Sequence, residues 1–215
     1  MKNEERAEHT KTKLRNALLD ALQDMPWEKL TVVEITYRAN LSRKTFYFYY
    51  QDIYDLATDC YYIYCIREFE TGSFDKDNIS ARTNAYLQQL VSQLDFYRRN
   101  RNFATMISAT ALSTSYFSRL VDCNLQLFRN YMDYAVLEKK QINDVSLKEL
   151  FSRCIFAVHQ TIAQNWLMND CKEPVESVAA CMHYLGIRIA DSIDLYTSTT
   201  TPWIEAVLNF APLTN

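Results

Sequence analysis

Residues 31–56 read TVVEITYRANLSRKTFYFYYQDIYDL, and this stretch decides the fold of the chain. It contains three helix starts. Thr31 (with a glutamate three residues later, as in a capping box), Ser42 and Asp52 each stand where a side chain can cap the following helix. The chain must turn sharply between the first two helices at Asn40, a residue type that tolerates a left-handed backbone. This spacing predicts a helix-turn-helix.

The second helix of this motif has an apolar side and a cationic, aromatic side. Helical spacing places Phe46 and Tyr50 inward. The outward and flanking positions are then Arg43, Lys44, Thr45, Tyr47 and Phe48. Every charged residue between positions 35 and 51 is basic (Arg38, Arg43 and Lys44), so the surface is expected to be cationic. Such groups suit phosphate oxygens, base edges and thymine methyl groups in a DNA major groove, although a solvated basic face on a small helix pair is the alternative.

Four short motifs, TVVEI (31–35), ANLS (39–42), TFYFYY (45–50) and DIYDL (52–56), follow one another along this stretch. In their order and spacing they resemble, over residues 12–56, the N-terminal domain of the tetracycline-repressor (TetR) family of transcriptional regulators. The resemblance implies phosphate contacts from Thr31, Thr45, Tyr47 and Tyr49, and groove contacts from Arg43, Lys44 and Phe48. With the capping serine included, the predicted DNA-binding residues are Thr31, Ser42, Arg43, Lys44, Thr45, Tyr47, Phe48 and Tyr49.

The chain departs from the family pattern at four positions of this segment. Thr36, Asn40, Leu41 and Ile53 stand where the family has Ala, Gly, Val and, usually, Lys. The first three changes adjust size or backbone conformation. The last removes a cation that the family uses to bind phosphate, so this contact is either missing or supplied by Lys11, Lys13 or Arg15.

The composition of the whole chain favours helices. Its 215 residues include two glycines and four prolines, too few for a strand-rich fold, which needs turn residues about every 8–12 positions. We predict an all-α protein of about nine helices. A three-helix helix-turn-helix domain over residues 1–56 is joined by a long helix, from Asp52 to about residue 70, to a helical bundle within residues 57–215.

The charge and hydropathy of the chain exclude several classes of protein. A net charge of −3 and a pI near 5.7 argue against binding nucleic acid with the entire surface, while a local basic patch stays compatible. No apolar run approaches the roughly 20 residues of a membrane span, and the N-terminal segment lacks an apolar signal region. We therefore expect a cytoplasmic protein with no membrane partner.

The sequence shows no pattern typical of catalysis or metal binding. The six cysteines include no CxxC pair and no histidine at ligand spacing, so reduced core thiols are expected, with a thiol-based redox switch as the alternative. No nucleophile, paired acid and base groups or phosphate loop is found. We predict no enzymatic activity, no cofactor and no metal.

The TetR resemblance implies that the C-terminal bundle encloses a cavity for a small-molecule effector. The predicted ligand-binding residues are Tyr61, Tyr64, Phe103, Met106, Phe117, Phe128, Tyr131 and His159. Apolar stripes of this kind are also explained by core packing, and His159 is more simply explained as a hydrogen-bonded structural histidine.

Two long helices are expected near the C-terminus, at about residues 146–169 and 174–196. Both carry more apolar surface than one buried face needs, which predicts a partner, and the resemblance implies a homodimer with a four-helix interface. The predicted interface residues are Phe151, Val158, Ile162, Trp166, Val178, Met182, Leu185 and Ile189. A monomer with a larger internal core is the alternative.

These expectations combine into one predicted function. The protein is expected to be a repressor that binds a palindromic operator in double-stranded DNA as a homodimer and is released by an unknown small-molecule effector. The two reading helices would enter successive major grooves about 34 Å apart. The alternatives are a protein of the same fold that has lost DNA binding and acts through protein contacts, and a helical small-molecule carrier.

Overall fold

The computed structural model describes residues 2–67, 79–110, 119–120, 122, 141–142 and 145–198. The elements are α1 (Lys2–Asp24), η1 (Trp27–Lys29), α2 (Val32–Ala39), α3 (Arg43–Tyr49), α4 (Ile53–Tyr61), η2 (Tyr62–Ile66), α6 (Ile79–Arg99), α7 (Arg101–Thr110), β1 (Gln141–Ile142), β2 (Val145–Ser146), α9 (Leu147–Met168) and α10 (Val175–Ser198). The predicted all-α fold class is confirmed, with one antiparallel pair of two-residue strands, β1 and β2, as its exception in the described part. The sequence also predicts a loop at residues 72–77, a long helix at about 113–139 and a short helix at 203–210. The loop, the short helix and most of the long helix lie outside the described residues.

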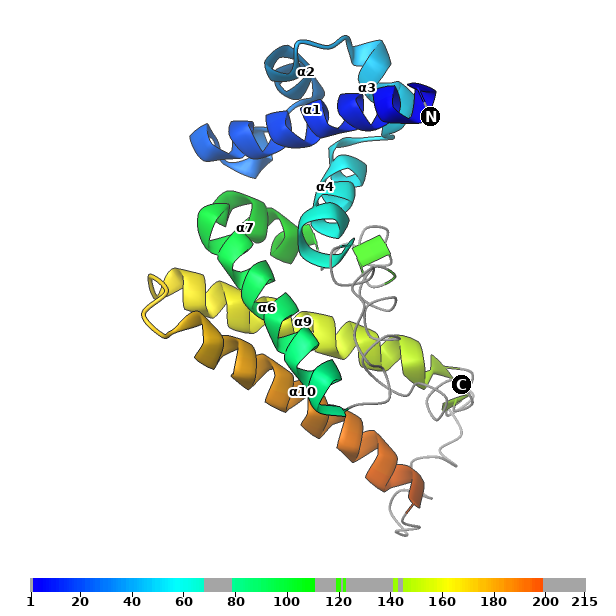
Figure 1. Cartoon of the computed structure of the whole chain (residues 1–215), viewed down its shortest axis with the longest axis vertical. Coiled ribbons are helices and arrows are strands. Elements are labelled where there is room, and N and C mark those ends of the chain that lie inside the picture. Colours follow the sequence, from blue (N-terminus) through cyan, green and yellow to red (C-terminus); the bar gives the residue numbers. More distant parts are fainter. Residues whose placement is uncertain are drawn as a thin grey trace, which may run out of the picture.

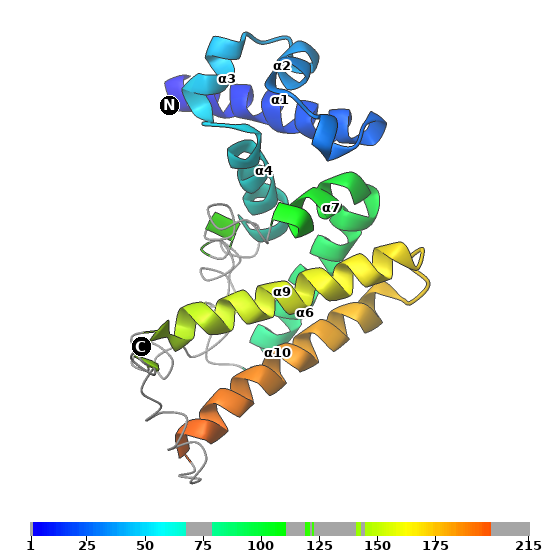
Figure 2. The same cartoon turned by 180° about the vertical axis from the view of Figure 1, so that it is seen from behind.

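The helices form two groups joined by α4 (Figure 1). At one end α2 and α3 pack on α1, and at the other end α9 and α10 lie side by side with α6 crossing them (Figures 1 and 2). A second contact joins the groups, because α7 reaches the end of α1. There the Asn102 side-chain amide donates to the Leu22 carbonyl at 2.8 Å, and Gln23 donates to the Asn100 side chain at 3.2 Å.

The three predicted helix caps of the helix-turn-helix segment are all formed. The side chains of Thr31, Ser42 and Asp52 accept hydrogen bonds from backbone N–H groups three residues later, at 3.2, 3.0 and 2.8 Å. Asn40 ends α2 in the left-handed conformation, with φ 51° and ψ 49°. These local interactions satisfy N–H groups that a helix start leaves without partners, and they fix the angle between α2 and α3.

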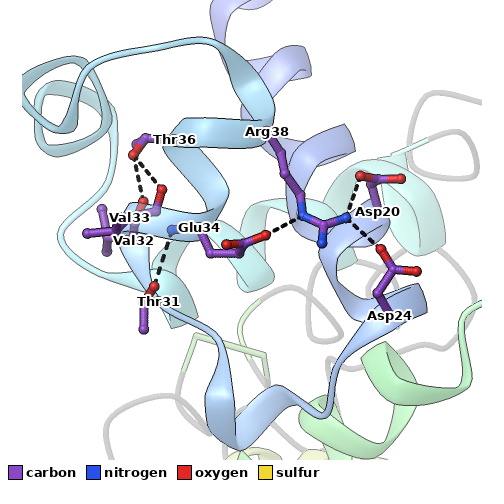
Figure 3. A network of polar contacts seen from close by, with 8 residues as sticks. All are labelled: Asp20, Asp24, Thr31, Val32, Val33, Glu34, Thr36 and Arg38. Carbon is purple, nitrogen blue, oxygen red and sulfur yellow. Dashed lines mark hydrogen bonds and ion pairs between the residues drawn. The ribbon is translucent and has the colours of Figure 1, made fainter.

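Thr36 shows how a polar residue is accommodated where the family has alanine. Its side chain is only 4% exposed. The hydroxyl donates within its own helix, towards the carbonyls of Val32 at 2.8 Å and Val33 at 3.1 Å (Figure 3). The substitution therefore leaves no unsatisfied hydroxyl in the core, and it needs no compensating partner elsewhere.

The predicted connecting helix is present but is not a regular α-helix. After α4 it continues as the π-helical turn η2, in which each turn contains an extra residue. This wide turn changes which side chains face inward. Regular helical spacing predicts Ile63 and Tyr64 on one face with Leu56 and Cys60, and Tyr61 on another. In the structure Tyr61, Cys65 and Ile66 are buried, whereas Ile63 and Tyr64 are half-buried.

The two long helices predicted at about residues 146–169 and 174–196 are present as α9 and α10, and they form an antiparallel hairpin. Its turn is held by the indole N–H of Trp166, which donates to the Glu173 carbonyl at 2.9 Å, and by Arg101, whose guanidinium donates to the Leu167 carbonyl at 3.0 Å. Pro174 precedes α10, where its missing N–H costs nothing. Within the ranges described, no helix combines the length and the apolar character that crossing a membrane requires.

Candidate functional site

The outer face of α3 carries the side chains that the sequence predicted to contact DNA. Phe46 (0% exposed) and Tyr50 (4%) are buried, as predicted, which fixes the rotation of α3 on its neighbours. Tyr47 and Phe48 are 59% and 79% exposed. Of the other predicted residues, Thr31, Ser42, Arg43 and Lys44 are exposed and Thr45 and Tyr49 are half-buried. Large exposed aromatic groups beside two exposed cations make an unusual surface for a seven-residue helix.

Arg38 does not contribute to this surface, contrary to the expectation from charge alone. Its guanidinium contacts Glu34 at 2.7 Å, Asp20 at 2.8 Å and Asp24 at 2.9 Å (Figure 3). The hydrogen bonds that Arg38 donates to these carboxylates, first of all to Asp20, raise the pKa of Arg38 above its ordinary value. The Glu34 carboxylate thus accepts from Arg38. Of the predicted capping box, the hydrogen bond from the Glu34 backbone N–H to the Thr31 hydroxyl is the part found among the hydrogen bonds of this region.

Two cations therefore remain on the outer face of α3. No ion pair of Arg43 or Lys44 is found among the described residues, and both side chains are exposed. A cation without a carboxylate partner is available to a phosphate or to a base edge, because binding need not break an existing pair. The local positive charge is thus concentrated on the first turn of α3.

The end of α3 is held by two acidic residues one turn apart on α4. Asp59 accepts a hydrogen bond from the Tyr50 hydroxyl at 2.5 Å and pairs with Arg15 of α1 at 2.8 Å. Burial, together with Asp59, raises the pKa of Tyr50, so the phenol stays protonated and donates. Asp55 accepts from the backbone N–H of Gln51 at 3.0 Å. Both carboxylates therefore fix the position of α3 relative to α4.

Arg15 is not available for the phosphate contact that the TetR resemblance assigns to a lysine at the position of Ile53. It is 2% exposed, and its guanidinium is bound by Asp59, Glu8 and Thr12. Burial by itself lowers the pKa of Arg15, but the hydrogen bonds that it donates to Asp59 and Glu8 raise this pKa above its ordinary value. Lys13 is exposed on the same helix and keeps this role as a prediction.

Sequence reasoning missed two exposed apolar residues on α2. Val33 and Tyr37 are 57% and 81% exposed and lie one helical turn apart. The available signal was the amphipathic pattern of α2, in which Ile35, Thr36 and Ala39 take the buried positions and leave Val33 and Tyr37 outward. These two side chains extend the candidate surface from α3 onto α2.

The predicted ligand-binding residues fall into three groups. Tyr61, Phe103, Met106 and His159 are all buried in the bundle. Phe117, Phe128 and Tyr131 lie outside the described residues. Tyr64 is elsewhere, since its ring stacks on Phe96 with centroids 5.3 Å apart and its hydroxyl donates to Asn16 of α1 at 3.1 Å. Tyr64 therefore extends from the connecting helix to contact both α6 and α1.

A buried hydrogen-bond network, which the sequence did not predict, crosses the middle of the bundle. Gln93 donates to the Tyr61 hydroxyl at 3.2 Å, and the Tyr97 hydroxyl contacts the Gln160 amide at 3.2–3.3 Å. Gln89 donates to the Cys65 carbonyl of η2 at 3.0 Å, while its side-chain oxygen is buried without a partner. Gln89, Gln93 and Tyr97 recur every four residues on α6, which is the signal that could have revealed this polar stripe.

His159 has the geometry of a structural histidine. Its Nε2 lies 3.2 Å from the Met182 carbonyl and donates to it. Burial lowers the pKa of His159 to about 4, although the Met182 carbonyl opposes this shift. The imidazole is therefore neutral at physiological pH and holds α9 against α10.

The neutral state of His159 gives a pH prediction. Because the folded pKa of about 4 lies below the ordinary value near 6.5, the unfolded chain binds the proton first as the pH falls. The free energy of unfolding is expected to decrease between about pH 6.5 and pH 4, by about 2 kcal/mol from pH 7 to pH 5. Urea unfolding at both pH values measures this loss, which should shrink in His159→Gln and persist in His9→Gln, whose histidine is exposed on α1.

The predicted interface residues of α9 and α10 lie mainly inside the chain. Phe151, Trp166, Val178 and Met182 are at most 7% exposed. Val158, Ile162 and Leu185 are half-buried, and the side chain of Ile189 is outside the described part. The outward positions are Cys154, Ala157, Thr161, Asn165 and Met168 on α9, and Ser177, Ala180, Cys181 and Tyr184 on α10. No Asp, Glu, Lys or Arg occurs in residues 154–169 or 177–187, so the middle of the accessible face of the hairpin is uncharged, whereas Glu176 is exposed in the first turn of α10.

No group of three or more His, Cys, Asp or Glu side chains that could hold a metal ion occurs in the described residues. Cys60 and Cys65 are buried, and burial raises the pKa of both thiols, which keeps them in the protonated, unreactive form. Cys154 and Cys181 are exposed instead, contrary to the expectation of core thiols.

The chain was compared with known proteins. No protein-family model matches it, and no curated protein sequence matches it. Among solved structures it is similar to the fatty acid degradation regulator FadR from Bacillus halodurans, with 14% identity and a TM-score of 0.51 over 82% of this chain and 94% of that chain. It is similar to the transcriptional regulator FadR from Bacillus subtilis in complex with stearoyl-CoA, with 13% identity and a TM-score of 0.54 over 81% and 96%. It is also similar to NalD, the secondary repressor of the MexAB-OprM multidrug efflux pump in Pseudomonas aeruginosa, with 14% identity and a TM-score of 0.51 over 85% and 96%.

Proposed function

We propose that this chain, which has the fold of TetR-like transcriptional regulators, is a ligand-responsive DNA-binding regulator. The observation that carries the proposal is the outer face of α3, where Arg43, Lys44 and Phe48 are exposed while Phe46 is buried. In this proposal residues 1–56 bind double-stranded DNA, and residues 57–215 bind an effector and a second copy of the chain.

A homodimer is proposed because a single short reading helix has little surface with which to bind DNA. Two copies related by a two-fold axis can place their α3 helices in successive major grooves of a palindromic site, about 34 Å apart. The uncharged middle of the outer face of α9 and α10 supports this arrangement, since burying uncharged side chains against a second copy has no charge-desolvation cost.

The proposed dimer face can be tested with a single charge. Ala180→Glu introduces a carboxylate into the exposed face of α10. In a symmetric interface each of the two copies would bury one such carboxylate, and both would lose their hydration. Sedimentation at micromolar concentration is expected to give the mass of two chains for the parent and a mass shifted towards one chain for Ala180→Glu. Gln88→Glu, on the exposed side of α6, is the matched control and should leave the mass unchanged. A parent protein with the mass of one chain would remove the dimer from the proposal.

The proposed response is release from DNA by a small-molecule effector, with the protein acting as a repressor. The similar FadR structure contains stearoyl-CoA, and the similar NalD is a repressor. Both properties belong to those proteins, and we extend them here as a proposal. One conformation of the dimer would hold the two α3 helices too far apart for successive major grooves. An effector that binds more tightly to this conformation would weaken DNA binding by the ratio of its affinities for the two conformations.

The experiment that tests the function is a selection of genomic DNA fragments with the purified full-length protein. We expect enrichment of a palindromic site, with an affinity that falls as the salt concentration rises. The second candidate is a regulator of the same fold that acts through protein contacts. Ile53 in place of a basic residue at the start of α4, with Asp52 and Asp55 beside it, favours that candidate. Failure to retain any duplex DNA at low salt would support it and would reject DNA binding.

A further inference from the structure

The turn between α3 and α4 is built around Asp55. One carboxylate oxygen accepts the backbone N–H of Gln51 at 3.0 Å, and the Asp55 backbone N–H itself donates to the capping carboxylate of Asp52 at 2.8 Å. Gln51 immediately follows Tyr50, the residue at which α3 ends. A displacement of Asp55 would therefore move the end of α3 directly.

The other oxygen of Asp55 is bound by a residue from a distant part of the sequence. Arg119 contacts it at 2.6 Å through Nη1, and its Nη2 donates to the side-chain oxygen of Gln51 at 3.3 Å. The short segment that contains Arg119 follows α7 in the chain and lies beside α4 in both views (Figures 1 and 2). One guanidinium thus holds both sides of the turn that ends α3.

The two acidic residues of α4 differ in where their cations come from. Asp59 is paired with Arg15, which belongs to α1 and is buried with it in the N-terminal group of helices. Asp55 is paired with Arg119, which belongs to the C-terminal part of the chain. The first pair holds the N-terminal group together, whereas the second connects that group to the rest of the molecule.

We propose that Arg119 is a positioning residue for DNA binding, because its guanidinium sets the position of the end of α3 through Asp55 and Gln51. This inference rests on the proposed function, because α3 must be the reading helix for its position to matter. The Arg119 contact is a further connection between the two groups, besides the connecting helix and the contact of α7 with α1. A rearrangement of the bundle that displaces Arg119 would therefore change the reading surface without bending α4.

The size of the effect follows from the exposure of the pair. Arg119 and Asp55 are 41% and 27% exposed, and pairs of this kind have coupling energies that correspond to about a 1.5- to 5-fold change in an equilibrium constant. Such a pair adds little to overall stability. Its removal is therefore expected to leave the protein folded and to affect the turn that it holds.

A double-mutant cycle in the full-length protein tests the proposal. Arg119→Ala, Asp55→Asn and the double variant are compared with the parent for affinity to the selected duplex. Asp55→Asn removes the charge and keeps an acceptor for the Gln51 N–H. Arg119→Ala is expected to weaken binding about 1.5- to 5-fold in the parent and to have a smaller effect in the Asp55→Asn background, where the contact of Arg119 with Gln51 remains. Arg98→Ala, which removes the exposed pair of Arg98 with Asp95 on α6, is the matched control and should change nothing.

Hydrogen exchange of the backbone amides gives a second measurement that needs no DNA. Arg119→Ala is expected to accelerate exchange at residues 50–52 and to leave α10 unchanged. Equal losses of affinity from Arg119→Ala in both backgrounds, or unchanged exchange at residues 50–52, would overturn the proposal. If the parent binds no duplex while exchange at residues 50–52 still accelerates, the proposed function fails and the positioning contact stands.

Discussion

Arg15→Ala is expected to lower the free energy of unfolding by about 3 kcal/mol, the lower end of the range for removing one partner of a buried ion pair. The side chain is 2% exposed and binds Asp59, which in turn holds the Tyr50 hydroxyl. Without the guanidinium, the carboxylate of Asp59 would keep only its phenol partner in a partly buried site. The change therefore removes the contact that joins α1, the end of α3 and α4.

Thermal unfolding measures this effect. For a chain of this size a loss of 3 kcal/mol corresponds to a fall in Tm of about 6–12 °C. Arg6→Ala is the matched control, because Arg6 is an exposed arginine on the same helix, and it should shift Tm by less than about 2 °C. Similar shifts in the two variants would contradict the assignment of Arg15 as the central cation of this group of helices.

Replacing Arg43 and Lys44 together by alanine is expected to lower operator affinity by about 10- to 100-fold at physiological salt. Both side chains are exposed at the start of α3, and neither supports the fold through an ion pair in the described residues. The slope of log affinity against log salt concentration should become shallower by about one for each phosphate contact that is lost. Tm should stay close to that of the parent, because exposed side chains without fixed partners contribute little to stability.

Lys172→Ala provides the comparison for this double variant, since Lys172 is exposed in the turn between α9 and α10, far from α3 in Figure 1. This variant removes one positive charge without changing the reading surface, so operator affinity should be unchanged. Parental affinity in the Arg43, Lys44 variant would show that α3 is not the reading helix.

The cations of the N-terminal helices fall into two groups, one bound by carboxylates and one exposed. Arg15 and Arg38 are bound by carboxylates on neighbouring helices and hold α1, α2 and α4 together. Arg43 and Lys44 have exposed side chains at the start of α3. The N-terminal helices therefore resemble a rigid platform, on which a small number of cations is left for a ligand with negative charge.

The caps at Thr31, Ser42 and Asp52 and the left-handed Asn40 could be predicted because each depends on atoms no more than three residues away. The inward positions of Phe46 and Tyr50 followed from helical periodicity alone. Interactions of this range are fixed by the local chain, whatever the rest of the molecule does.

Arg38 was assigned to the cationic surface because its partners Asp20 and Asp24 lie on another helix, 18 and 14 residues earlier. The polar stripe of Gln89, Gln93 and Tyr97 was overlooked for a similar reason, since Tyr61 and Gln160 become neighbours only when α4, α6 and α9 pack together. The apolar stripes of α9 and α10 were visible, but sequence periodicity does not distinguish a stripe buried inside the chain from one that faces a partner.

The sequence by itself determined the helices, their ends and the side of α3 that faces outward, since these depend on spacing and on neighbours along the chain. Only the tertiary structure decided which cations are neutralised, which polar groups meet in the core and which face of the α9–α10 hairpin is accessible. The physical reason is that charge pairing and burial depend on distances between residues far apart in the chain, and those distances exist only after the helices have packed.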